Sequence, residues 1–309
     1  MIKRLTLSFF SLLLCVGMYA QVANYIYVSG QAGEYSYLTD ISLLKSNLSV
    51  GGAGAVGFGY ELHANNFLFN LGLSAQISHT ILNGKNALYR LDNVVDDEGD
   101  KLSYIFDQQK RTDGYTSVNL QVPLMVGAQA KKFYFLIGAK FDMSMVAFAK
   151  STAWISSKGV YDKLVDPIDD MPEHAFFNQQ AFTTRNRVQL NPNVLLSLEM
   201  GGRLHAVEKG TGFDVPKDKD YGRLAFYVDF GLFNLNRGGS KELLELPTSF
   251  NTTDMTTAIK VNDILSSSVA ENAVRSLSIG IKYTYLFRIK DRVGCVICRD
   301  AYKAYQPNL

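Results

Sequence analysis

The sequence has few cysteines, almost no net charge and no long apolar run beyond its first residues. Only 3 of the 309 residues are cysteine. The 31 basic and 29 acidic residues nearly balance, so the chain has no cationic field that would attract nucleic acid. No later segment reaches the roughly 20 apolar residues that a transmembrane helix needs. The sequence therefore predicts no nucleic-acid partner and no membrane-spanning helix.

Motifs of catalysis and cofactor binding are also lacking. No G-x-S-x-G element occurs, and the adjacent Ser78 and His79 would point to opposite faces of a strand. A nucleophilic hydroxyl needs its base within hydrogen-bond reach. His63 and His205 are not spaced as metal ligands. We therefore expect no enzymatic activity, no metal and no cofactor.

The chain is rich instead in alternating apolar and polar residues. Every second residue from Phe133 to Ala149 is phenylalanine, isoleucine, methionine or alanine, whereas the residues between them include Lys140 and Asp142. We call each of these alternating sets a parity of the strand. A period of two indicates a β-strand. This stretch exceeds the roughly 9–11 residues with which a strand crosses a membrane. It predicts a membrane strand with its apolar parity, Ala147 included, on the lipid side.

Seven other segments alternate in the same way, although the parity of the first is ambiguous, because Tyr25 and Tyr27 compete with Ile26 and Val28. Short links near 63–65 and 130–131 contrast with long polar loops over 81–114, 150–190 and 237–273, as in outer-membrane barrels. We predict an all-β, antiparallel, up-and-down transmembrane β-barrel over 21–289. It has eight strands, or ten if the charged link at 206–220 hides a strand pair. The eight predicted strands are 24–37, 51–61, 67–77, 117–126, 133–149, 194–203, 223–232 and 277–287.

The competing fold is a soluble eight-stranded barrel of the lipocalin type, with its apolar residues inside. An interior of eight strands is just filled by side chains or holds one small ligand. The many large apolar residues would overfill it, so the alternation favours a polar interior.

Two sets of residues follow from these parities. Aromatic residues gather at the strand ends that meet the short links, where they predict a girdle at the lipid–water boundary. Charged residues on the interior parity predict a network of ion pairs, because an unpaired buried charge is costly. The girdle comprises Phe58, Tyr60, Phe67, Phe69, Phe133, Phe135, Tyr283, Tyr285 and Phe287, and the interior network comprises Lys140, Asp142, Glu199, Arg203, Arg223, Asp229 and Lys282.

The N-terminus has the pattern of a signal peptide. Lys3 and Arg4 precede a short apolar run, and the small Ala20 precedes a cleavage site. We expect cleavage after Ala20, export to the bacterial outer membrane and a periplasmic tail over 290–309. Cys295 and Cys298 of that tail form a C-x-x-C pair without a thioredoxin-like context. They are expected to form a local disulfide or to stay a reduced pair, and an exported compartment favours the disulfide.

Two motifs resemble small outer-membrane β-barrel proteins of Bacteroidetes. The segment VNLQVPLMV at 118–126 is similar to a strand with an apolar-Pro-Leu core in that family. The segment GGAGAVGFGYEL at 51–62 is similar to its Gly-rich strand near the N-terminus. A mature chain that starts at Gln21 is also common there. The resemblance implies an OmpA-like or PorT-like outer-membrane barrel, a family without shared catalytic residues.

These observations predict a non-enzymatic surface-binding or envelope-structural role through long outer loops. The expected partners are outer-membrane lipid, an extracellular ligand at the loops, and an envelope or secretion protein at the tail. The alternatives are a small-solute channel or porin, in which the interior charges would set selectivity, and an accessory barrel of a protein secretion system.

Overall fold

The computed structural model describes residues 22–64, 66–95, 99–161, 167–168, 176–204, 220–237, 241–246, 259–268 and 274–289. The predicted signal peptide, most of the 206–220 link and the tail with Cys295 and Cys298 lie outside the described residues. None of the described helices is long and apolar enough to cross a membrane.

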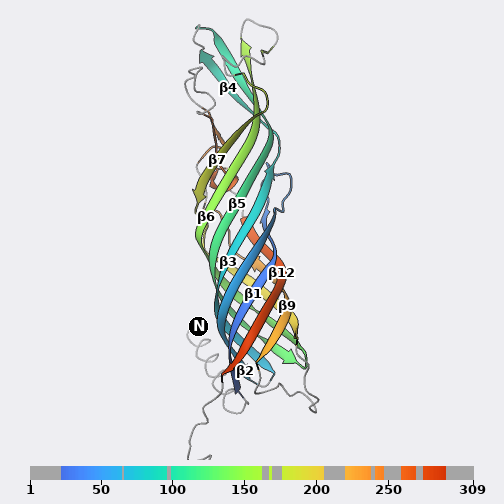
Figure 1. The fold of residues 1–309 in the computed structure, drawn as a ribbon. Coiled ribbons are helices and arrows are strands. Elements are labelled where there is room, and N and C mark those ends of the chain that lie inside the picture. Colours follow the sequence, from blue (N-terminus) through green and yellow to red (C-terminus); the bar gives the residue numbers. More distant parts are fainter. Residues whose placement is uncertain are drawn as a thin grey trace, which may run out of the picture.

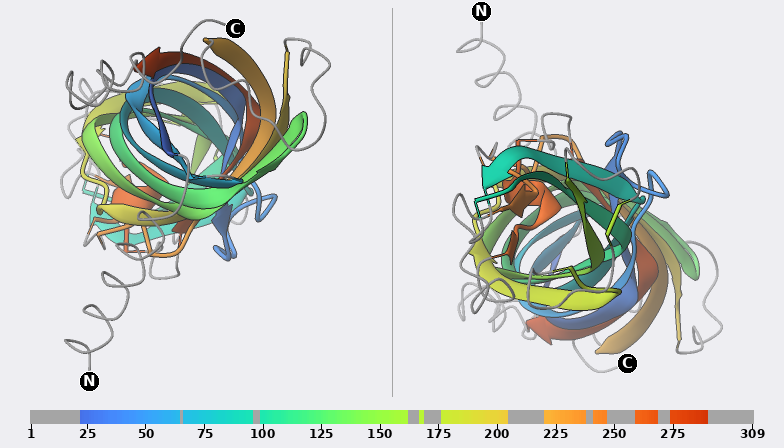
Figure 2. Two further views of the ribbon diagram at one scale, coloured as in Figure 1. Left: turned by 90° about the horizontal axis from the view of Figure 1, so that it is seen from below. Right: turned by 90° about the horizontal axis from the view of Figure 1, so that it is seen from above.

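Eight long antiparallel strands pair into a closed ring (Figures 1 and 2). Their order is β5-β3-β2-β1-β12-β9-β8-β6, and a further pairing of β5 with β6 closes the ring. These are the eight predicted segments, so the all-β antiparallel prediction is confirmed. The strands are β1 (Val22–Thr39), β2 (Val50–Ala64), β3 (Phe67–Gly84), β5 (Lys101–Ala130), β6 (Phe133–Tyr161), β8 (Asn193–Arg203), β9 (Tyr221–Gly231) and β12 (Val274–Ile289).

The apolar parity faces outward in the lower half of the ring, which is the end with the short β2–β3 and β5–β6 turns in Figure 1. Phe133 is 75% exposed and Phe226 is 67% exposed, whereas Glu61 and Arg223 are buried. The apolar-inside arrangement of the lipocalin-type alternative is therefore wrong for this half. On β1, Tyr25 and Tyr27 are buried, which resolves the parity of that strand.

The outward parity of β6 changes partway along the strand. A register shift against β5 pairs Asn119 with Ser144 but Val118 with Val146, which leaves Met145 as an extra residue. Such a bulge moves every later side chain to the other face. Ala147 is therefore buried and Phe148 exposed, so the prediction that Ala147 faces outward is wrong.

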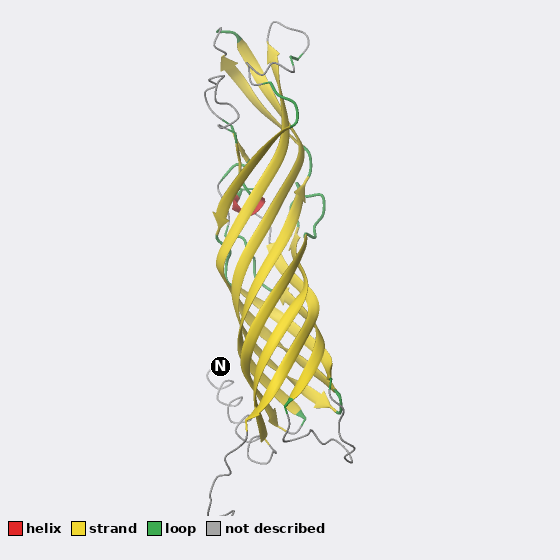
Figure 3. Cartoon of the chain, in the orientation of Figure 1, coloured by secondary structure: helices red, strands yellow, loops and turns green. Residues whose placement is uncertain are grey.

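Strands replace much of the two predicted loops at 81–114 and 150–190. The β5–β6 pair extends beyond the ring, flanked by β4 (Ala87–Val95) and β7 (Gln180–Val188), as Figures 1 and 3 show. Inward residues of this extension, among them Phe106, Ile155 and Phe182, form an apolar core together with Leu244, Ile259 and Val261. The prediction of long polar loops is wrong where these strands stand, because their alternation also has a buried apolar face.

The third long loop folds back against the inner wall of the ring. Its described parts, 241–246 and 259–268, contain β10 (Leu244–Glu245), β11 (Lys260–Val261) and the 3-10 turn η2 (Ile264–Ser266). Figure 2 shows this orange segment within the upper opening. We call these two parts the inserted segment.

Tyr27 fills the space above two glycines of the lower ring. Gly59 and Gly72 are paired across β2 and β3, and a Cβ at either position would collide with the Tyr27 hydroxyl. That hydroxyl donates to Asn70 Oδ1 at 3.0 Å. The two glycines are therefore needed for close approach of the tyrosine.

We expect Gly72→Ala to destabilise the protein by about 1–3 kcal/mol, the usual cost of overpacking, because Tyr27 must leave its site. The free energy of unfolding in urea measures this loss. Gly30→Ala is the matched control, because no atom lies within 4 Å of a Cβ at that strand glycine. Equal stability of the two variants would contradict the packing role of Gly72.

Candidate functional site

The lower interior is built around an ion pair between Glu61 of β2 and Arg223 of β9. Arg223 donates two hydrogen bonds to the carboxylate, at 2.8 and 2.6 Å. His63 Nε2 lies 2.7 Å from Glu61 Oε1. Glu61 is 0% exposed and Arg223 is 1% exposed. This two-pronged pair joins strands on different sides of the ring.

A second ion pair lies beside the first. Lys282 Nζ donates to Glu199 Oε2 at 2.8 Å, and Tyr134 donates its hydroxyl proton to Glu199 Oε1 at 2.6 Å. The Arg223 guanidinium lies 4.2 Å from the centroid of the Tyr134 ring. Tyr134 therefore connects the two pairs, so that charges from four strands form one network.

The third ion pair joins Lys140 to Asp229 at 2.7 Å, and Ser197 donates to the same carboxylate at 2.6 Å. Asp142 instead accepts hydrogen bonds from two amides, Gln121 at 2.9 Å and Asn119 at 3.2 Å. Polar side chains thus fill the level above the first two pairs.

All seven predicted interior charges are buried within the ring. Lys140 pairs with Asp229 and Lys282 with Glu199, but the partner of Arg223 is Glu61. Arg203 lies 4.4 Å from the centroid of the Tyr221 ring. Sequence reasoning missed Glu61 and His63 as members of the network. Both follow Gly57 and Gly59 at a spacing of two residues, and this alternation could have predicted that their side chains point into the ring.

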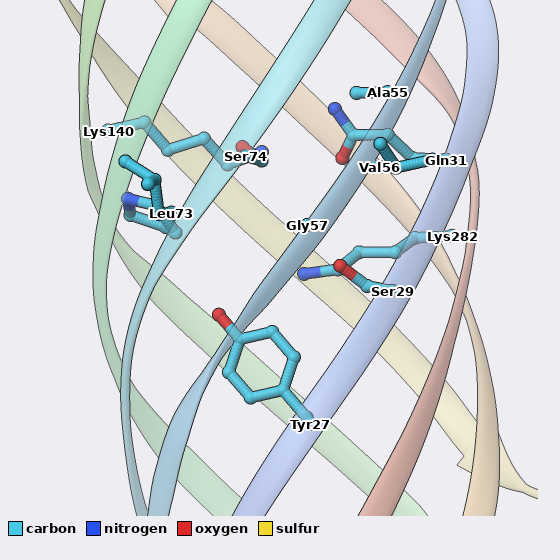
Figure 4. A pocket seen from close by; sticks show the side chains of 11 residues that line it. Tyr27, Ser29, Gln31, Ala55, Val56, Gly57, Leu73, Ser74, Lys140 and Lys282 are labelled. Carbon is cyan, nitrogen blue, oxygen red and sulfur yellow. The ribbon is translucent and has the colours of Figure 1, made fainter.

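Little open space remains between these groups. The cavity among Tyr27, Lys140 and Lys282, shown in Figure 4, has a volume of about 10 Å³. A single water molecule needs roughly 10–15 Å³. This cavity therefore has room for about one water molecule.

The upper interior is occupied by the inserted segment, which is held by inward residues of β5. Arg111 pairs with Asp113 at 3.1 Å and donates to the backbone carbonyls of Leu243 and Asn262. Asp113 accepts the Ile264 amide proton at 2.9 Å. Burial raises the pKa of the Asp113 carboxyl, against the opposing effect of Arg111. The Arg111 guanidinium and the Ile264 amide both act against this rise, because both favour the charged form of the carboxyl.

Tyr115, the next inward residue of β5, completes this contact. Its hydroxyl accepts the Leu265 amide proton at 3.1 Å and donates to Asp263 Oδ1 at 3.4 Å. Burial raises the pKa of the Tyr115 phenol well above its ordinary value, so the hydroxyl keeps the proton that it donates. Ile264 and Leu265 pack in an apolar cluster with Tyr37 of β1. The inserted segment is thereby anchored to both β5 and β1.

The nine predicted girdle residues all lie in the lower part of the ring. Phe58 is paired with Val28 and Leu73, and Phe135 with Ala128 and Met200. Phe69 and Tyr285 are partly buried. The other members of the girdle are exposed, namely Phe58, Tyr60, Phe67, Phe133, Phe135, Tyr283 and Phe287.

The outer face of the extension has a polar depression of about 480 Å³. Ser156 lies at its centre: its hydroxyl donates to Asn178 Oδ1 at 3.1 Å and accepts from Gln109 Nε2 at 3.0 Å. Asp107 and Lys158 also line the depression. This surface combines hydrogen-bond donors and acceptors with both signs of charge.

The adjacent Ser78 and His79 lie on opposite faces of β3. Ser78 is buried and bonds Ser117 at 2.8 Å, whereas His79 is on the outer face and bonds Thr116 at 2.9 Å. Among the described residues, no group of three or more His, Cys, Asp or Glu side chains could hold a metal ion. No family model and no curated protein matches the chain.

We expect Glu61→Gln and Arg223→Met each to cost about 3–5 kcal/mol of unfolding free energy, because each leaves a buried charge without its partner. The double variant should lose clearly less than the sum of the two. Unfolding in urea, followed by circular dichroism in detergent, measures all four proteins. Strictly additive losses would show that the pair is not coupled.

We expect Arg111→Met to release the inserted segment, because it leaves the buried Asp113 carboxylate without its cation, at a cost of about 3–5 kcal/mol. Hydrogen exchange should become faster at the Ile264 and Leu265 amides. Arg90→Met is the control, because the Arg90–Asp92 pair is exposed and such pairs contribute about 0–1 kcal/mol. Unchanged exchange in Arg111→Met would contradict the anchoring role.

Proposed function

We propose that this chain is a closed, integral β-barrel of a bacterial outer membrane, which holds a rigid β-extension above the membrane surface. Its role is non-enzymatic: it presents the extension for surface binding or for support of the envelope. The observation that carries the proposal is the belt of exposed apolar side chains around the lower ring. Soluble monomers rarely expose apolar patches above a few hundred Å².

The belt has the dimensions that a membrane requires. On β5 it runs from Ala128 to Val118, and on β6 from Phe133 to Met145. The first span, of 11 residues, fits the roughly 9–11 residues of a tilted transmembrane strand, and the second, of 13 residues, is slightly longer. Lipid contains no hydrogen-bond partners, so a spanning sheet must close on itself. The eight-stranded ring supplies that closure.

The filled interior argues against the channel alternative. Three ion pairs cross the lower ring, and the inserted segment occupies the upper opening. For ions to pass through the ring, both the ion pairs and the inserted segment would have to move aside. The charges predicted as a selectivity lining are better explained as a structural network.

The extension supports a role at the surface. Its strands pack around an apolar core that they share with the inserted segment. Its polar depression is the described surface that we assign to an extracellular ligand. The motifs at 51–62 and 118–126 support an OmpA-like or PorT-like barrel, and a secretion-accessory role would depend on the tail beyond the described residues.

Tryptophan fluorescence tests the membrane assignment. Trp154 is the only tryptophan of the chain and lies on the extension, above the belt. In vesicles with brominated acyl chains, the fluorescence of wild-type Trp154 should hardly change. The double variant Trp154→Phe/Phe226→Trp moves the fluorophore into the belt, so bromine should quench most of its emission.

Equal quenching at the two positions, or failure to insert into vesicles, would refute the membrane assignment. The same vesicles fused to a planar bilayer test the closed interior, and we expect no stable conductance. Stepwise, salt-dependent currents would instead support the small-solute channel.

A further inference from the structure

Three basic side chains form a cluster on the outer wall, directly above the apolar belt. Lys150 of β6 is paired with Arg185 of β7, and Arg187 is paired with Phe148. All three cations are exposed. We call Lys150, Arg185 and Arg187 the basic triad. It occupies the part of the wall where β7 takes over from β8 as the neighbour of β6.

The triad is a concentration of like charge without compensation. Residues directly opposite on antiparallel strands have Cβ atoms about 4.5–5.5 Å apart, and like charges there are destabilising. Within the described part of the chain, none of the three side chains makes an ion pair or a hydrogen bond. Two other exposed arginines have partners, since Arg90 pairs with Asp92 and Arg237 donates to Gln189. Arg275, by contrast, is a single exposed arginine on β12. An external anion would relieve the repulsion.

The surroundings of the triad indicate what kind of anion fits. On the β5 side, Lys150 is paired with Gly114, and the His79 ring lies over that glycine, 3.5 Å from the position of a Cβ. His79 and Thr116, which are hydrogen-bonded to each other at 2.9 Å, add polar groups beside the triad. Phe148 lies beside Arg187 and two residues below Lys150 on β6; it is 48% exposed and continues the apolar belt. The wall is therefore cationic above and apolar below, over a distance of two residues along β6.

We propose that the basic triad binds the phosphorylated headgroup of an anionic membrane lipid, whose acyl chains lie against Phe148 and the belt. Arginine recognises phosphate oxygens through two parallel hydrogen bonds, and basic clusters at a membrane boundary attract anionic lipids. A soluble phosphate would use the cations but not the adjoining apolar wall. This inference rests on the proposed function, because it needs the belt to lie in lipid.

Native mass spectrometry tests the triad. The full chain is placed in phosphatidylcholine nanodiscs that contain a small fraction of diphosphoryl lipid A, and retained lipid A is counted after release. The triple variant Lys150→Gln/Arg185→Gln/Arg187→Gln should retain it about tenfold less, since each cation strengthens the attraction to an anionic surface. The matched control Lys45→Gln/Lys101→Gln/Lys241→Gln removes the same charge from exposed positions elsewhere and should bind like the wild type.

The outcomes separate this inference from the proposed function. Equal retention by the triple variant and its control, with normal insertion of both, would overturn the triad site and leave the membrane assignment intact. Displacement of lipid A by excess inorganic phosphate would also overturn it, in favour of a simple anion site. Failure of the wild type to enter nanodiscs would overturn both proposals.

Discussion

The pairing of β5 with β6 closes the ring, and the rest of the structure depends on this closure. Each of the eight strands thereby has a neighbour on both sides, and the sheet has a distinct inside and outside. Alternation along every strand then divides the side chains between the two environments. The extension also starts from this pair, because β5 and β6 continue together far beyond the other strands.

Closure at eight strands leaves a narrow interior, which contains paired charges beside tyrosines and apolar side chains such as Met125 and Leu136. The pair between Glu61 and Arg223 and the pair between Lys282 and Glu199 each join strands that are not neighbours in the ring. The desolvation free energy of such buried charges offsets much of the Coulomb attraction between them. Their consequence is geometric: each carboxylate accepts from a cation on another strand, so the strands are held in one arrangement.

The interior of the ring is occupied differently at its two ends, because different residues point inward there. Below, charge pairs and tyrosines cross the interior. Above, Arg111, Asp113 and Tyr115 of β5 bind the backbone of the inserted segment. On the outside, the apolar belt ends where Lys150 and its neighbours on β7 begin. The position of each group along a strand therefore decides which environment it meets.

The sequence by itself determined the strands of the ring, their antiparallel order and the inward direction of all seven predicted charges, because a period of two is a local property of the chain. It could not determine that Arg223 pairs with Glu61, since these two residues are 162 positions apart and are brought together only by closure of the ring. The bulge at Met145 and the inserted segment were also decided by tertiary structure, because their stabilising partners on β5 are distant in the sequence. In the extension, β4 pairs with the next strand along the chain, but the apolar face of these two strands is buried by residues of β6, β7 and the inserted segment.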